Sequence, residues 1–202
     1  MSRTTASAGP GRKAVLATGN PDKARELAPL FPGLELAPAP AGFDADETGA
    51  TLFQNALIKA AALRPRAPAD AVVIADDSGL MVHALGGRPG VFSSRYAGAD
   101  ATYEDNCRRL LEELDGRSDR RAAFVCVLVA LSPDGETLVA VGSCPGDIAP
   151  SPRGEGGFGY DPVFTPAGSR LTMAEMSPDQ KAAVSHRGRA ARQMAALLGL
   201  AA

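Results

Sequence analysis

The sequence predicts an α/β fold in which a mixed β-sheet is flanked by helices. In the first half, the apolar runs Ala14–Ala17 and Ala71–Ala75 are separated by helical patterns such as Thr51–Leu63, the order of strands joined through helices. In the second half, the strand-like runs Ala122–Leu131 and Thr137–Gly142 flank the turn sequence Ser-Pro-Asp-Gly-Glu, which predicts an antiparallel hairpin. A sheet with both kinds of connection is mixed.

The expected helices have start signals of their own. Asn20 and Pro21 have the order of an N-cap and a first helical residue, so a helix should run from there to about Phe31. Thr102 and Ser177 are similar caps. The other expected elements are helices over Thr51–Leu63, Tyr103–Leu114 and His186–Leu198 and short strands at Leu34–Leu36 and Pro162–Thr165. Four residues of the last helix are expected to pack inward: Ala190, Met194, Leu197 and Leu198.

Length and composition fit one domain or two closely packed lobes. The chain has 202 residues, 45% hydrophobic and 22% charged; residues 1–12 are expected to form a flexible tail and residues 13–202 the domain. A formal net charge of −2 argues against binding polymeric nucleic acid. No apolar stretch approaches the ~20 residues that cross a membrane. Three cysteines without metal-site spacing indicate a reducing compartment, so we expect a cytoplasmic protein.

A first candidate site joins a strand end to a helix start. The segment Thr18–Lys23 carries a lysine in the first helical turn. Free backbone N–H groups and the helix dipole at such a terminus favour an anion, so a phosphate group would fit. The alternative is a capped helix with a surface lysine. Neither a Walker P-loop nor a dinucleotide-binding fingerprint is present.

Two adjacent carboxylates, Asp76 and Asp77, end an apolar strand and precede a Ser-Gly turn. Successive side chains of a strand point to opposite faces, so at least one carboxylate should project into the cleft at the carboxyl end of the sheet. A carboxylate there needs a cation. Glu47, in an acidic loop, can supply a second oxygen ligand for Mg²⁺, which typically takes one or two carboxylates together with water and phosphate oxygens. The alternative is that the pair caps the following segment.

The predicted helix Thr51–Leu63 carries a polar stripe. Thr51, Asn55 and Lys59 are spaced four residues apart and share one face, while leucine and alanine side chains lie elsewhere on the helix. We expect this stripe to face water or a ligand.

The segment Gly154–Asp161 combines glycines with two aromatic residues and an acid. Glycine lets the backbone approach a flat ligand, and an aromatic ring can stack on a nucleobase for about 1–3 kcal/mol. Lys181, His186 and Arg187 follow, and Arg187 has a planar donor fork of fixed charge. The alternative is a flexible loop with core aromatic residues. A lone histidine is more often a cap than a catalyst, and we assign His83 to structure.

Six segments together resemble the inosine triphosphate pyrophosphatase family, the Ham1-like pyrophosphatases of non-standard purine nucleoside triphosphates. In chain order they are LATGNPDKARELA, ETGATLFQNALIKA, IADDSGL, LGGRPGVFSSRYAG, GGFGYDPVF and AEMSPDQKAAVSHRG. The whole resemblance runs from Val15 to about Met194. The resemblance implies an elongated mixed α/β fold of two lobes with a central substrate cleft, commonly a homodimer. It also implies Mg²⁺-dependent hydrolysis of inosine, deoxyinosine and xanthosine triphosphates to the monophosphate and pyrophosphate, which removes deaminated purines from the nucleotide pool.

The resemblance also assigns roles to individual residues. Glu47 and Asp77 match the magnesium-associated acids, and Asp77 matches the proposed proton acceptor for the attacking water. A carboxylate that binds a cation directly is a weak proton acceptor, so these two roles compete. Asp76 would support the turn or the groups around the metal. The residues matched to substrate binding are Thr18, Gly19, Asn20, Pro21, Asp22 and Lys23 at the phosphate end, Ser78 beside the acids, and Phe158 (the stacking ring), Gly159, Tyr160, Asp161, Lys181, His186 and Arg187 around the purine and sugar.

Hydrogen bonding favours a 6-oxo purine as the base. Such a purine presents an acceptor where adenine presents an amino donor, so Arg187 and Lys181 should favour it. Two other functions stay open: a nucleotide sensor without turnover, and a related Maf-like pyrophosphatase of modified pyrimidines. The acids argue against the sensor, and the FGYD and SHRG motifs favour a purine. The chain departs from the family pattern at Cys144, where an aromatic residue is common, and Arg95 is given only a supporting role.

Overall fold

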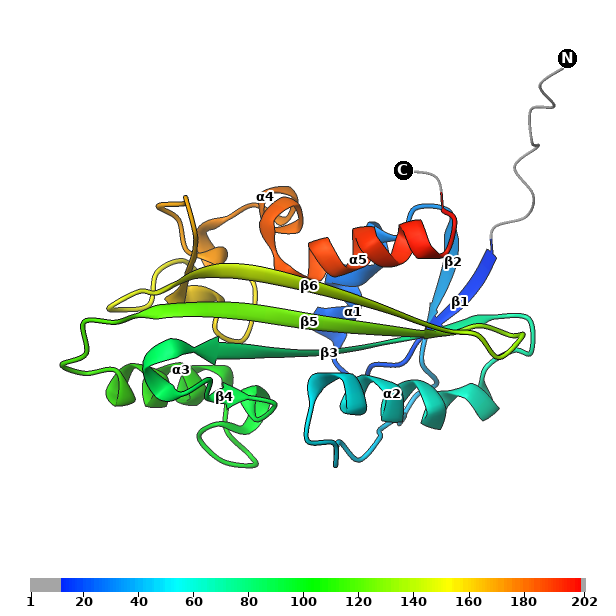
Figure 1. Ribbon diagram of the computed structural model, residues 1–202, viewed down its shortest axis with the longest axis horizontal. Coiled ribbons are helices and arrows are strands. Elements are labelled where there is room, and N and C mark those ends of the chain that lie inside the picture. The colour runs from blue at the N-terminus through cyan, green and yellow to red at the C-terminus, as the bar shows by residue number, and fades with distance from the viewer. Residues whose placement is uncertain (1–11, 201–202) are drawn as a thin grey trace, which may run out of the picture.

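Three long strands extend through the whole molecule (Figure 1). The computed structural model describes residues 12–200, and within them the sheet has the order β2-β1-β3-β5-β6-β7, with β4 paired to β3. Strand β1 is parallel to β2 and β3, whereas β3, β5 and β6 pair antiparallel, so the predicted mixed sheet is confirmed. The strands are β1 (Arg12–Leu16), β2 (Leu34–Pro38), β3 (Val72–Val82), β4 (Pro89–Gly90), β5 (Arg121–Leu131), β6 (Thr137–Ile148) and β7 (Phe164–Pro166).

Three helices begin at the predicted caps Asn20, Thr102 and Ser177, and Thr51, predicted as a helical residue, is also a cap. The Asn20 side chain accepts hydrogen bonds from the Asp22 and Lys23 amides, and Thr51 caps the following helix. Thr102 and Ser177 form complete capping boxes. These contacts satisfy amide groups that have no partner inside a helix, so the local sequence fixes where each helix starts. The helices are α1 (Pro21–Leu27), α2 (Leu52–Leu63), α3 (Tyr103–Glu113), α4 (Pro178–Val184) and α5 (His186–Leu197).

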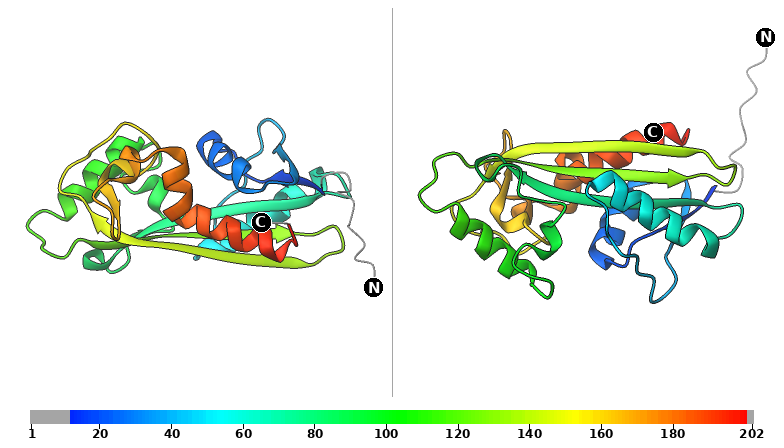
Figure 2. Two further views of the ribbon diagram at one scale, coloured as in Figure 1. Left: turned by 90° about the horizontal axis from the view of Figure 1, so that it is seen from above. Right: turned by 60° about the horizontal axis from the view of Figure 1, so that its bottom comes forward.

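Two lobes form around the long strands (Figures 1 and 2). In the first lobe, which contains β1, β2, α1, α2 and α5, helices α5 and α2 cover opposite faces of the sheet. Ile74 packs on the α5 side, and its neighbours Val73 and Ala75 pack on the α2 side, as strand alternation requires. In the second lobe, α3, β4 and β7 surround a separate core that includes Leu110 and Phe164. The long strands connect the two cores.

The predicted end of β3 is wrong. The Ser-Gly turn expected after the two aspartates is absent, because β3 continues through both carboxylates to Val82. Strand β5 pairs with this whole stretch, including Asp77 with Val127 and Gly79 with Val125. Gly79 has a packing role instead, since a Cβ atom there would lie 2.5 Å from the carbonyl oxygen of Gly90 on β4. The aspartates therefore lie in the middle of a strand, not at its end.

Smaller differences concern element ends and single side chains. Strand β6 extends past Gly142 to Ile148 because β5 pairs with it throughout. Leu197 is 48% exposed and not inward, since it lies on the outer face of α5. The predicted tail lies outside the described residues except for Arg12, which begins β1. All three cysteines are buried and free, and no helix in the described chain has the length and hydropathy to cross a membrane.

Candidate active site

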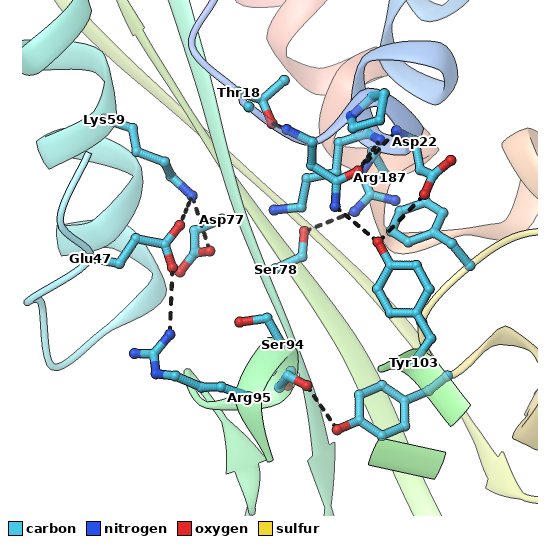
Figure 3. Close-up of a pocket in the computed structure, with 18 of the residues that line it drawn as sticks. Thr18, Asp22, Glu47, Lys59, Asp77, Ser78, Ser94, Arg95, Tyr103 and Arg187 are labelled. Carbon is cyan, nitrogen blue, oxygen red and sulfur yellow. Dashed lines mark hydrogen bonds and ion pairs between the residues drawn. The ribbon is translucent and has the colours of Figure 1, made fainter. Parts of the chain in front are cut away.

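A cavity of about 830 Å³ opens between the two lobes, a size typical of small-molecule sites (Figure 3). Strand β1 ends beside Ile74, so the turn that follows it emerges next to the two aspartates of β3. Every residue predicted to bind substrate or metal lines this cavity: Thr18, Gly19, Asn20, Pro21, Asp22, Lys23, Glu47, Asp77, Ser78, Phe158, Gly159, Tyr160, Asp161, Lys181, His186 and Arg187.

Asp76 is fully buried and lies between two cations. Its Oδ2 is 3.2 Å from Lys23 Nζ and 3.7 Å from Arg187 Nη2, and it accepts a hydrogen bond from Ser78 Oγ at 3.2 Å. Burial acts to raise the pKa of Asp76, but Lys23 and Arg187 outweigh it and hold that pKa well below its ordinary value. Asp76 is therefore ionised, and it links the predicted phosphate contact to the predicted base contact.

Asp77 points to the opposite face, where α2 and the acidic loop meet it. Asn55 Nδ2 donates to Asp77 Oδ2 at 3.1 Å, and Lys59 Nζ is 3.2 Å from Asp77 Oδ1 and 2.6 Å from Glu47 Oε1 (Figure 3). Burial raises the pKa of Asp77, and the attraction of Lys59 only partly opposes this. Two residues of the polar stripe, Asn55 and Lys59, therefore face the carboxylates and are buried, whereas the third, Thr51, is the exposed N-cap of α2. Sequence reasoning found this stripe but gave Asn55 and Lys59 no role.

Arg95 reaches across the cavity from the second lobe. Its Nη1 is 3.9 Å from Glu47 Oε2 (Figure 3). Its guanidinium lies over the Phe92 ring, 5.2 Å from the centroid. Both lobes thus place charged groups around Glu47, with Lys59 on one side and Arg95 on the other.

An aromatic ring forms the opposite end of the cavity. Lys181 Nζ and Arg187 Cζ lie 5.0 Å and 5.3 Å from the Phe158 ring centroid, which are cation–π distances. The Asp161 carboxylate accepts a hydrogen bond from the Phe158 amide at 2.7 Å and pairs with Lys181. Burial raises the pKa of Asp161 despite this pairing. Asp161 therefore fixes the ring-bearing loop. Tyr160 is largely buried and donates its hydroxyl proton to the Ser93 carbonyl, so it forms part of the cavity wall.

Glu26 belongs to the same network although sequence reasoning missed it. Its Oε2 is 2.6 Å from Arg187 Nη1, and its Oε1 pairs with Lys181. Glu26 lies three residues after Lys23 on α1, so its position on the same helical face was the available signal. With Asp76, it holds Arg187 from two sides.

His186 is buried and neutral. Its ring stacks on Phe124 with centroids 4.6 Å apart, and burial followed by the charge of Arg187 lowers the pKa of His186 well below its ordinary value. His186 Nδ1 and Arg187 Nε have no hydrogen-bond partner among the described residues. Unpaired buried polar atoms are costly, so a ligand or water in the cavity is the expected partner. Cys144 lies in the core of the second lobe, away from the cavity wall.

The fold and the cavity define an α/β protein with an interlobe site for an anionic ligand that carries a flat ring. Cationic side chains and an aromatic ring lie at one end, and acids with a central lysine lie at the other. Comparison with known proteins identifies the family: the chain belongs to the Ham1 family, whose model matches residues 14–197.

Individual relatives cover almost the whole chain. A dITP/XTP pyrophosphatase of Geobacillus kaustophilus is 48% identical over 186 residues, which is 89% of this chain and 90% of that protein. A dITP/XTP pyrophosphatase of Escherichia coli (strain K12) is 48% identical over 188 residues, covering 89% and 94%. The solved Ham1 protein of Staphylococcus aureus is 41% identical and matches with a TM-score of 0.82 over 93% of this chain and 98% of that chain.

Proposed function

We propose that this chain is a nucleoside triphosphate pyrophosphatase that hydrolyses dITP, ITP and XTP to the nucleoside monophosphate and pyrophosphate. The Ham1 family membership and the dITP/XTP pyrophosphatase relatives support this function. One observation carries it: the acids Glu47 and Asp77 converge on Lys59 in a cavity that has a cationic turn and a cation-flanked aromatic ring on its other walls. A triphosphate with a purine ring matches that distribution of charge and shape.

The residues in the cavity support hydrolysis at the innermost phosphorus. Lys23, in the first turn of α1, attracts the phosphates, while Phe158 stacks on the base. Asp77 lines the same cavity, beside Glu47 and Lys59. Without a bound cation, burial raises the pKa of Asp77, which suits it to deprotonate an attacking water; Mg²⁺ bound directly to it would oppose this.

Mg²⁺ fits the acids of this cavity. Lys59 Nζ already lies between the Glu47 and Asp77 carboxylates, so the two side chains converge on a position that favours positive charge. Within the described chain no three His, Cys, Asp or Glu side chains gather as an all-protein metal site. Mg²⁺ needs no such cage, because it takes few carboxylates and completes its shell with water and phosphate oxygens. Bound there, it would neutralise charge that develops on the phosphates.

Arg187 supports selection of the base. The guanidinium has only donors, and the acids Asp76 and Glu26 fix its position. A 6-oxo purine offers an acceptor to such a group, whereas adenine offers an amino donor that would leave Arg187 Nε without an acceptor. Arg187 therefore favours 6-oxo purines, which include inosine and xanthosine nucleotides, over adenine, and the dITP/XTP pyrophosphatase relatives support dITP and XTP among them.

Product analysis tests the proposal. With Mg²⁺, the purified protein should release pyrophosphate from dITP, ITP and XTP far faster than from ATP or GTP. Asp77→Asn should lower that rate at least ~100-fold, because it removes the carboxylate that either accepts the proton or binds the cation. Asp119→Asn, the same substitution at the surface, is the matched control. Release of orthophosphate, equal use of all purines, or binding without turnover would reject the function.

A homodimer and a cytoplasmic location stay predictions that follow from the family resemblance and from cysteine usage. Large exposed apolar side chains are compatible with a subunit contact: Phe53, Phe92, Val139 and Val141. Sedimentation equilibrium over a range of protein concentrations measures whether a dimer forms.

A further inference from the structure

Tyr103 belongs to the second lobe but bonds to the first. It is the first residue of α3, and its hydroxyl accepts a hydrogen bond from Asn20 Nδ2 at 3.2 Å and donates one to Asp22 Oδ2 at 3.4 Å (Figure 3). Its ring also faces Phe158, with centroids 5.8 Å apart and planes tilted by 44°. Tyr103 thus contacts both the turn Thr18–Lys23, called the phosphate turn below, and the Phe158 ring at the base end of the cavity.

The second lobe fixes the position of this side chain. Thr102 and Asp105 form a capping box around the start of α3, with hydrogen bonds of 3.1 Å and 3.0 Å. Asn106, one turn on, accepts from the Ala97 amide at 2.7 Å and donates to the Ser94 carbonyl at 3.1 Å. The helix start is therefore anchored to the segment that also carries Arg95.

The contact on the first lobe falls on the residue that shapes the phosphate turn. Asn20 Oδ1 is already used, since it caps α1 by accepting from the Asp22 and Lys23 amides at 2.9 Å and 3.3 Å. Its amide nitrogen remains to donate, and Tyr103 accepts from it. The position of Lys23 therefore depends, through Asn20, on Tyr103 of the other lobe.

We propose that Tyr103 is a positioning residue that sets the distance between the phosphate turn and the Phe158 ring, and hence the fit of a purine triphosphate across the cleft. This inference rests on the proposed function of the cavity. Tyr103 is 42% exposed and lies at the rim of the cavity, so it aligns the two binding surfaces and takes no part in the chemistry. Its loss should weaken substrate and transition state alike, which raises KM and leaves kcat unchanged.

Steady-state kinetics test the role with a matched pair of variants. Tyr103→Phe removes the two hydrogen bonds and keeps the ring, and should raise the KM for dITP about three- to tenfold with kcat within about twofold. Tyr96→Phe is the control, because the Tyr96 hydroxyl accepts from Arg88 in the same lobe but outside the cavity. It should leave KM unchanged. Equal KM values in both variants, or a fall in kcat that accounts for the change in Tyr103→Phe, would overturn the proposal.

Fluorine NMR gives a readout that a merely structural role would not move. The chain has three tyrosines, so a protein labelled with 3-fluorotyrosine gives three resonances, and Tyr103→Phe identifies one of them. Inorganic pyrophosphate, which has no base, should shift the Tyr103 resonance through the phosphate turn and leave the Tyr96 resonance in place. An active wild type whose Tyr103 resonance does not respond would reject only the positioning role. A wild type that releases no pyrophosphate from dITP would reject the proposed function, and this inference with it.

Discussion

Asp76 and Asp77 are neighbours in the chain with opposite electrostatic surroundings. Asp76 faces Lys23 and Arg187, which hold its pKa below the ordinary value although burial opposes them. Asp77 faces Lys59, but burial dominates there and its pKa is raised. A group whose charged form is stabilised by the fold contributes to the free energy of folding. A group whose charged form is disfavoured by the fold is suited to proton transfer. Adjacent positions on one strand therefore serve stability and reactivity separately.

The same substitution should separate the two roles. Asp76→Asn leaves Lys23 and Arg187 without their shared partner and should lower the free energy of unfolding by about 3–5 kcal/mol. Asp77→Asn removes a buried charge that the fold disfavours, so its stability should equal or exceed that of the wild type while activity is lost. Urea denaturation measures both free energies. A larger loss of stability in Asp77→Asn than in Asp76→Asn would contradict this division.

The contribution of Asp76 to stability should depend on pH. Its pKa is lower in the folded than in the unfolded state, where it is about 3.9. The stabilisation is therefore complete above pH ~4 and is lost as the pH falls from there toward the folded-state pKa. The difference in unfolding free energy between wild type and Asp76→Asn should accordingly shrink from pH 7 to pH 3. A difference that stayed constant over this range would show that the ion pairs do not cause it.

At the scale of elements, the close packing of α5 on β6 positions the base end of the site. Gly142 makes that approach possible, since a Cβ atom there would lie 2.0 Å from the His186 carbonyl oxygen and 2.4 Å from the Ala190 amide. Gly188 allows a similar contact with α4, because its Cβ would lie 1.9 Å from the Ala182 carbonyl oxygen. Only glycine at positions 142 and 188 leaves room for the first turn of α5, which carries Arg187, to pack this closely.

Gly142→Ala should move that helix. The added methyl group meets backbone atoms that cannot rotate away, so α5 must shift, with a loss of about 1–3 kcal/mol in unfolding free energy. The KM for dITP should rise as well, because Arg187 moves with the helix. Ser143→Ala, at the next and exposed position of β6, is the control and should match the wild type in both measurements. Wild-type KM and stability in Gly142→Ala would show that the contact does not position α5.

At the scale of the whole molecule, residues from different segments of the chain bind the phosphate end and the base end of a substrate in the cleft. Lys23 lies in the turn after β1 and Arg187 at the start of α5, yet both contact Asp76 on β3. Their effects on stability should therefore be coupled, while their effects on substrate choice should differ because they face different parts of the ligand.

Two substitutions test this arrangement. Lys23→Ala should raise the KM of every triphosphate by a similar factor, because it removes a phosphate contact. Arg187→Ala should narrow the ratio of kcat/KM between ITP and ATP, since it removes the donor that favours a 6-oxo base. In urea denaturation the double variant should lose less stability than the sum of the single losses. The same substrate profile in both single variants would reject the two-ended cleft.

The sequence by itself determined the family, the helix starts and the opposite directions of Asp76 and Asp77, because caps and strand alternation are set by neighbouring residues. The mixed sheet also followed from local motifs, and the predicted site residues, all of which line the cavity, followed from local motifs together with the family resemblance. The tertiary structure alone decided that β3 continues past Ser78, because that depends on pairing with β5. It also decided the partners of Lys59, Glu26 and Tyr103: these contacts join segments far apart in the chain, and only the packing of two lobes around shared strands brings such segments together.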